Sequence, residues 1–239
     1  MTKFIALVSG KGGVGKTTTT ISLGQALHNL GKDVIVVDGN LVTPNIATHL
    51  GIPNPQSTLN KFLRKEKSLK DIIQTHESGL RIIPSSPSYT EFQKTNIGQL
   101  NKLFNQLENV ADIILIDAPS GLGYDVEQIL KNCDEALIIA NPTLPSVMDA
   151  LKTVQLAQAH ENTITGVILN MVHNDRHELK QQQVEEILGH QVIAKIPFHK
   201  KVRRALHQGS PLPTLFPRCK PSREIKVAAQ YLCFESREE

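Results

Sequence analysis

Paired cysteines and tryptophan are missing from this chain. Of its 239 residues none is tryptophan, and the three cysteines, Cys133, Cys219 and Cys233, are widely spaced, with no CxxC or CxC pair. This spacing argues against a disulfide framework and against a zinc or iron-sulfur clamp. We therefore expect isolated thiols, and we set aside a metal or cluster carrier built on paired cysteines.

Long hydrophobic runs are missing as well. The longest, such as Phe4 to Val8 and Ile113 to Ile116, are far shorter than the roughly 20 residues needed to cross a bilayer. Met1 leads almost at once into a strand-like run that ends on a glycine-rich loop, which is not the pattern of a cleavable signal peptide. We expect no transmembrane helix and a cytoplasmic location.

The chain has little excess of either charge sign, because its formal net charge is only +3. This excess does not by itself indicate nucleic acid, so basic residues must be judged by their clustering. With 40% hydrophobic residues, the chain can bury a substantial core, and α/β domains of this length are common. We expect a single domain over residues 1–239.

Short, β-branched apolar runs alternate with stretches of helical spacing. One such stretch has Ile21, Leu27 and Leu30 on one face and ends at Gly31, a plausible helix cap. Alternating strands and helices predict an α/β fold with a doubly wound, mostly parallel sheet of about seven or eight strands. The runs are Phe4 to Val8, Val34 to Val37, Leu80 to Ile83, Asp112 to Ile116, Ala136 to Ala140, Gly166 to Leu169 and Val192 to Ile196.

The first apolar run is followed by a loop that satisfies the pattern GxxxxGKS/T and then opens an amphipathic helix. A triphosphate needs several backbone N–H donors at close range, and glycines let the chain curl tightly enough to supply them. We expect Lys16 to contact the β and γ phosphates and the Thr17 hydroxyl to bind magnesium. The predicted nucleotide-binding residues are Gly10, Lys11, Gly12, Gly13, Val14, Gly15, Lys16, Thr17 and Thr18.

A carboxylate ends another apolar run, at Asp117, and Ala118-Pro119-Ser120-Gly121 follows it. In open parallel sheets, ligands bind beyond the carboxyl ends of the strands. Magnesium keeps most of its hydration shell, so an acid at a strand tip can hold the ion through water. The run fits a Walker B element and makes Asp117 a predicted metal ligand.

The loop sequence KGGVGKT, with its extra lysine at Lys11, resembles the deviant Walker A motif of the MinD/ParA ATPases, and the resemblance spans nearly the whole chain. It implies a P-loop NTPase fold, ATP/ADP and Mg²⁺ as ligands, and an ATP-dependent homodimer. In that family the lysine matching Lys11 reaches the nucleotide of the other subunit. A second lysine beside a polyphosphate can stabilise the transition state much as an arginine finger does.

The same resemblance assigns Asp38, in Val37-Asp38-Gly39-Asn40, to a position near the metal and the γ phosphate. MinD and ParA proteins typically carry a second Asp where this chain has Asn40, and that acid is associated with positioning the attacking water. An amide cannot accept the proton, although a glutamine orients water in other P-loop enzymes. We therefore favour a slow or partner-stimulated ATPase over an inactive one. The predicted catalytic residues are Lys11, Lys16, Asp38 and Asn40, and the predicted metal ligands are Thr17, Asp38 and Asp117.

Adenine is favoured over guanine, because neither Asn60-Lys61 nor Asn101-Lys102 continues into the Asn-Lys-x-Asp element of GTPases. By resemblance, Asn170 matches the family's adenine-contacting asparagine, and Ile196-Pro197 matches the segment that lines the base. Both Asn170 and Pro197 are also compatible with ordinary strand ends. The Asn141-Pro142 pair and the helix after it, which includes Asp149, resemble the family's dimer-facing and partner-facing region.

Bacterial MinD proteins bind membrane through a basic amphipathic helix after the last core helix. Here residues 222–232 read as the last core helix and the residues from Phe234 to Glu239 are acidic, which disfavours anionic lipid. We expect no intrinsic membrane-anchoring helix. A basic cluster remains, which forms either a nonspecific DNA surface or, as we prefer, a solvated helix face. It comprises Lys200, Lys201, Arg203 and Arg204, with Arg218, Lys220 and Arg223 further on.

The resemblance thus implies a MinD-like ATPase switch that positions or regulates another cellular component through an unidentified protein partner. A ParA-like DNA-segregation ATPase is the nearest alternative. A hydrolysis-deficient module, in which ATP only locks the dimer, also stays open because of Asn40.

Overall fold

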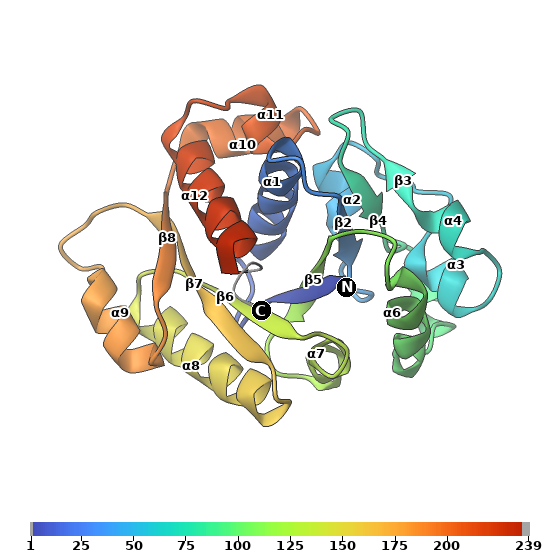
Figure 1. The fold of residues 1–239 in the computed structure, drawn as a ribbon, viewed down its shortest axis with the longest axis horizontal. Helices are drawn as coiled ribbons and strands as arrows, with labels where there is room; N and C mark the ends of the chain where they lie inside the picture. The colour runs from blue at the N-terminus through green and yellow to red at the C-terminus, as the bar shows by residue number, and fades with distance from the viewer. Residues whose placement is uncertain (1, 236–239) are drawn as a thin grey trace.

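The structure is a computed structural model that describes residues 2–235 (Figure 1). An eight-stranded sheet runs through the molecule in the order β3-β4-β2-β5-β1-β6-β7-β8. The strands are β1 (Lys3–Ser9), β2 (Val34–Asp38), β3 (Gln74–Thr75), β4 (Arg81–Ile83), β5 (Ile113–Ser120), β6 (Glu135–Ala140), β7 (Thr163–Val172) and β8 (Val192–Pro197).

All neighbouring strands are parallel except β3, which pairs antiparallel with β4. The doubly wound, mostly parallel sheet predicted from the apolar runs is therefore confirmed. Each run matches a strand, although Leu80 and Asp112 precede the first residues of β4 and β5. β3 was not predicted, because Gln74 and Thr75 form no apolar run. Their pairing with Ile82 and Arg81 at the sheet edge makes them a strand.

Helices connect the strands and cover both faces of the sheet (Figure 1). They are α1 (Lys16–Asn29), α2 (Ile46–His49), α3 (Leu59–Leu63), α4 (Leu69–Ile72), α5 (Tyr89–Gln93), α6 (Asn101–Leu107), α7 (Tyr124–Leu130), α8 (Leu144–Ala159), α9 (Gln181–Leu188), α10 (Lys200–His207), α11 (Leu212–Leu215) and α12 (Lys220–Glu235), with a 3₁₀ turn, η1 (Ile97–Gln99). The expected last core helix is α12, and the predicted acidic end at residues 236–239 lies outside the described residues.

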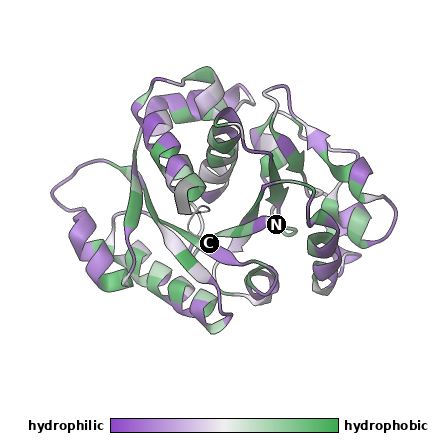
Figure 2. Ribbon diagram, viewed as in Figure 1, coloured by the Kyte–Doolittle hydropathy of each residue, from purple (hydrophilic) through white to green (hydrophobic). Residues whose placement is uncertain are grey.

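Two apolar cores form because successive strand side chains point to opposite faces. Ile5 and Leu7 of β1 join the core under α1, α2 and α10–α12, whereas Phe4, Ala6 and Val8 join the core under α3, α4 and α6–α9. Figure 2 shows the central strands mostly in the hydrophobic colour and the helices with mixed colouring. This is the pattern of a buried parallel sheet between two amphipathic layers.

Helix α1 is held close to the sheet by a missing side chain. A β-carbon at Gly24 would collide with Val36 of β2, so the glycine allows the helix to approach. The helix ends as predicted at Gly31, which has φ +83°. Gly31 N donates to His28 O and Lys32 N donates to Leu27 O, the paired bonds of a Schellman cap. Gly24 therefore allows α1 to pack closely on the sheet, and the cap at Gly31 terminates the helix.

The strand order decides which loops meet. β2, β5 and β1 are neighbours, and Asp38 lies directly opposite Asp117 in the β2–β5 register. β6, β7 and β8 follow on the other side of β1, so Asn170 and Pro197 share that half of the carboxyl edge. Among residues 2–235, no helix has the length and apolar character needed to cross a membrane.

Candidate functional site

The glycine-rich loop sits over the carboxyl end of β1 and leads into α1. Gly13 and Gly15 have φ +82° and +85°, a left-handed conformation that disfavours any side chain. A β-carbon at Gly10 would collide with the backbone of Asp149 in α8, and one at Gly15 would collide with the Asn170 amide. The loop thus needs glycine both for its curl and for its close packing.

Lys16 and Thr17 converge on Asp117. The Lys16 ammonium lies 2.7 Å from Asp117 Oδ1 and also donates to Ala118 O, while Thr17 Oγ1 donates to Asp117 Oδ2 at 2.6 Å. Lys16 and Asp117 are both buried. A buried carboxylate is tolerated when cations and hydroxyl groups satisfy its oxygens. The structure therefore brings together the three residues predicted to bind phosphate and metal.

Asp38 is fully buried and is held by backbone amides. Asn45 N and Ile46 N donate to its Oδ2 at 3.0 Å each, and Asn40 N donates to Oδ1 at 3.2 Å. Burial nevertheless raises the pKa of Asp38 from 3.8 to about 7, and the neighbouring Asp117 carboxylate adds to the rise. Ionised Asp38 is therefore unfavourable in the ligand-free protein, and a cation bound beside Asp38 and Asp117 would stabilise the ionised form.

Asn40 is tied to the loop that follows it. Its side-chain amide donates to Thr43 Oγ1 at 2.9 Å, and its Oδ1 accepts from Thr43 N at 3.0 Å. Its backbone amide is one of the three that donate to Asp38. Asn40 and Thr43 both line a groove that runs along the glycine-rich loop. The residue predicted to position the attacking water therefore lies beside the expected site of the phosphates.

A groove of about 360 Å³ runs along the loop from Lys11 to Thr18, with Asn40, Thr43, Asn45, His49 and Ser120 on its other wall. Its backbone donors, its lysines and the Thr17 hydroxyl fit a polyphosphate with a magnesium ion. The carboxylates of Asp38 and Asp117 do not line the groove but lie buried behind it, where they accept from the lining residues Asn40, Asn45, Lys16 and Thr17. Within the described residues, no group of three or more His, Cys, Asp or Glu side chains could bind a metal without phosphate oxygens. All three cysteines are free.

A second pocket, of about 240 Å³, adjoins the groove and shares Gly15 and Thr18 with it. Asn170 and Pro197 both line this pocket, together with apolar side chains of α10 and α12. The Asn170 amide donates to Val14 O at 2.7 Å, so the pocket wall is bonded to the phosphate loop. The size, lining and position of the pocket suit a nucleotide base.

The partner-facing pair and the basic cluster also have defined places. Asn141 Nδ2 donates to Asn170 O at 3.0 Å, which links the end of β6 to the base pocket. In α10, Lys201 and Arg204 lie over the Phe216 ring at 5.2 and 5.5 Å from its centroid. Arg203 lies over the Phe198 ring at 5.6 Å from its centroid, so three of the four cations of this helix pack against aromatic faces.

Three groups in the site were not among the residues predicted from the sequence. Thr20 Oγ1 donates to Asp117 Oδ1 at 3.2 Å, and its position one helical turn after Lys16 is the signal that points to it. The amides at the start of α2 cap Asp38, which no side-chain pattern shows. His49, at the end of α2, lines the groove with its Nδ1 2.8 Å from Asn45 O, and burial lowers its pKa.

Comparisons with known proteins agree with this geometry. Residues 5–212 match the model of the CobQ/CobB/MinD/ParA nucleotide binding domain. An uncharacterized ATP-binding protein of Methanocaldococcus jannaschii is 31% identical over 229 residues, which cover 95% of this chain and 87% of that protein. The septum site-determining protein MinD of Pyrococcus horikoshii, solved with Mg-ADP, superposes with a TM-score of 0.94 at 27% identity, covering 99% of this chain and 98% of that one.

A further solved structure, the MinC:MinD cell division protein complex of Aquifex aeolicus, gives a TM-score of 0.87 at 27% identity and covers 99% of this chain and 98% of that one. The matches thus span both halves of the sheet, including the phosphate loop and the base pocket. The chain belongs to the CobQ/CobB/MinD/ParA family of nucleotide-binding P-loop ATPases.

Proposed function

We propose that this protein is a MinD-like switch that binds and hydrolyses ATP, dimerises when ATP is bound, and thereby positions or regulates another cellular component. One observation supports it most. Lys16 and Thr17 converge on Asp117, while Lys11 lies in the open groove and forms no ion pair within residues 2–235. A lysine left free beside a phosphate site is available to a second nucleotide.

In the proposed cycle, the loop amides, Lys16 and Thr18 hold the phosphates, and Asn170 and Pro197 hold the base. Thr17, Asp117 and Asp38 would hold magnesium, which supplies charge neutralisation at the phosphates. On nucleotide binding, Lys16 must exchange its contact with Asp117 for the phosphates. The exchange frees an Asp117 oxygen at the point where a hydrated metal ion would sit.

Dimerisation is the first test of this function. We expect ATP with Mg²⁺ to double the mass measured by size exclusion with light scattering, and ADP to leave the chain monomeric. Lys11→Ala should weaken the ATP-dependent dimer at least about tenfold, since the ammonium would contact phosphate across the interface. Lys131→Ala, at an exposed lysine after α7, should leave the dimer unchanged. A dimer that forms equally well in ADP would contradict the proposal.

Asn40 sets the rate in this proposal. Asn40→Asp should raise ATP turnover about tenfold or more, because a carboxylate can accept a proton from the attacking water and an amide cannot. The Asp side chain can keep both bonds to Thr43, with the hydroxyl as donor. Asn54→Asp, which adds the same charge on an exposed turn, is the matched control. If Asn40→Asp binds ATP but turns it over no faster, Asn40 does not limit the cycle.

A protein partner and a cytoplasmic location belong to the same proposal. The Aquifex aeolicus relative was solved in complex with MinC, which supports a partner of some kind here, and three free cysteines suit a reducing compartment. ATP-dependent dimers without turnover would instead indicate a binding module that awaits an activator.

A ParA-like role in DNA segregation is the second candidate. It would use Lys200, Lys201, Arg203 and Arg204 of α10, whose side chains are at least partly exposed. Binding to arbitrary duplex DNA that weakens steeply with salt, and that is lost when these four residues are neutralised, would favour it.

A further inference from the structure

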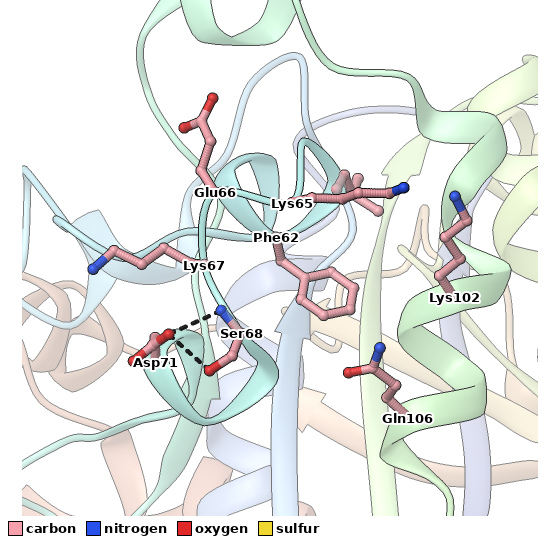
Figure 3. Close-up of a pocket in the computed structure, with 9 residues that line it drawn as sticks. Phe62, Lys65, Glu66, Lys67, Ser68, Asp71, Lys102 and Gln106 are labelled. Atoms are coloured by element: carbon pink, nitrogen blue, oxygen red, sulfur yellow. Dashed lines mark hydrogen bonds between the residues drawn. The ribbon is translucent and has the colours of Figure 1, made fainter.

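A cleft of about 500 Å³ lies away from the nucleotide groove, between the α3–α4 segment and α6. Its floor includes Phe62 and Leu63, which are 7% and 5% exposed. In Figure 3 the Phe62 ring occupies the space between the two walls, and Gln106 of α6 extends toward it. The cleft therefore has an apolar base that is mostly buried, with a small part of Phe62 and Leu63 exposed to it.

Lys65 and Lys102 approach this base from opposite walls, whereas Lys67 lines the cleft but extends away from Phe62 (Figure 3). Lys65 and Lys67 come from the α3–α4 turn and Lys102 from α6, and Figure 3 shows Lys65 extending toward the α6 wall, where the Lys102 ammonium also lies. No ion pair forms at any of the three within residues 2–235, although Lys102 Nζ donates to Gln99 Oε1 at 3.1 Å. These cations are available to an outside anion.

The acids at the cleft are already engaged. Glu66 accepts two bonds from the Arg64 guanidinium, at 2.6 and 2.9 Å, and these bonds lower the pKa of Glu66. Asp71 accepts from Ser68 N and Ser68 Oγ at 2.9 and 2.7 Å, which caps α4. Glu66 is paired with Arg64, whereas Asp71 keeps its negative charge near Lys67. The three lysines outnumber this one acid, so the rim is net positive.

Lys65 has a left-handed backbone conformation, in which glycine is the preferred residue. Lys65 has φ +62°, and the bonds Lys65 N to Phe62 O and Glu66 N to Lys61 O, both 2.8 Å, make it the left-handed residue of a Schellman cap on α3. A side chain in this left-handed conformation is less favourable than glycine. An unfavourable residue that places an ammonium at a cleft is a reason to look for function.

The α3 wall is also rigidly placed. Asn60 Nδ2 donates to Thr95 Oγ1 at 3.1 Å and Asn60 Oδ1 accepts from Ser86 N at 2.8 Å. Arg64 Nη1 donates to Glu91 O at 3.2 Å. Because these bonds fix α3 to the segment around α5, the charged rim needs little rearrangement to receive a ligand.

We propose that this cleft docks an acidic segment of a partner protein, with one apolar side chain over Phe62 and carboxylates against Lys65, Lys67 and Lys102. Charge complementarity and the apolar floor together select this occupant. Nucleic acid fits less well, because the one arginine of the α3–α4 segment, Arg64, is bound to Glu66 and Glu91, and no exposed aromatic ring at the cleft offers stacking. The site lies outside the nucleotide groove and stands independently of the proposed ATPase cycle.

Fluorescence anisotropy of the full chain can test this docking site. The probe is a fluorescein-labelled peptide of glutamates around one central leucine, compared with the same peptide carrying serine in place of leucine. We expect the leucine peptide to bind more tightly. The triple variant Lys65→Gly, Lys67→Gln, Lys102→Gln should weaken binding at least about tenfold, from a few-fold loss per lysine.

A second triple variant, Lys131→Gln, Lys200→Gln, Lys201→Gln, removes the same charge elsewhere and should bind the leucine peptide as the native chain does. Thermal unfolding checks that both variants fold. Lys65→Gly should not impair folding, because glycine prefers the left-handed conformation at this position. The proposal is overturned by any of three results: no binding to the native chain, equal losses in both variants, or duplex DNA that binds this cleft more tightly than the peptide.

Discussion

Replacing Lys16 by alanine is expected to lower ATP turnover by at least about two orders of magnitude. The ammonium is the one cation that the structure places at the centre of the site, 2.7 Å from Asp117. Without it, charge that develops on the phosphates loses a preorganised donor in a buried setting. Phosphate release from ATP with Mg²⁺, measured at saturating nucleotide, reports the loss in turnover.

The fold should survive this change, because Thr17 and Thr20 still donate to Asp117. Lys3→Ala is a matched control. Lys3 begins β1, at the end away from the phosphate loop, and forms a 2.6 Å ion pair with Glu135 of β6. We expect that variant to keep native turnover. A Lys16→Ala protein that hydrolyses ATP at the native rate would refute the assigned role of the phosphate loop.

Asp38 should make the ligand-free protein less stable as the pH rises from about 4 to about 7. The folded state keeps the Asp38 proton up to a pKa of about 7, whereas the unfolded chain loses it near 3.8. Over that range the folded state binds more protons, so its stability falls with a slope approaching about 1.4 kcal/mol per pH unit. Below pH 4 the effect vanishes, and above pH 7 it is constant.

Urea unfolding of the native chain and of Asp38→Asn across this range isolates the effect. The free energy of unfolding of Asp38→Asn should rise relative to that of the native chain as the pH rises. Altered hydrogen bonds change this difference only by an amount that does not depend on pH. Asp71→Asn is a control of opposite sign, because hydrogen bonds from Ser68 lower the pKa of Asp71, and the stability it contributes is lost as the pH falls. A flat difference between native and Asp38→Asn would show that the carboxylate is ionised near its ordinary pKa.

Parts of the site that depend on local spacing could be predicted from the sequence. The GxxxxGKS/T pattern predicted a curled loop and a helix start, and the structure shows Gly13 and Gly15 at positive φ. An apolar run ending in Asp117 predicted an acid at a strand end, and that acid accepts from Lys16 and Thr17. These features follow from conformational limits of single residues and from strand periodicity.

Other features depend on how the chain folds back on itself, over short or long separations, and no residue pattern shows this. The amides of Asn45 and Ile46 cap Asp38 because α2 folds back over β2, and the two-residue strand β3 exists only through its pairing with β4. The charged cleft is formed by α6 and the α3–α4 segment, which are 29 positions apart at their nearest ends, Ile72 and Asn101. No local pattern carries such contacts.

The sequence by itself thus determined the strand–helix alternation, the phosphate loop and the carboxylate at the end of β5, since each depends on residues within one turn or one strand. The tertiary structure decided the protonation of Asp38, the adjoining base pocket and the lysine-rimmed cleft. Their physical basis is burial and charge proximity, which exist only after the sheet has brought separate strand ends and helices together.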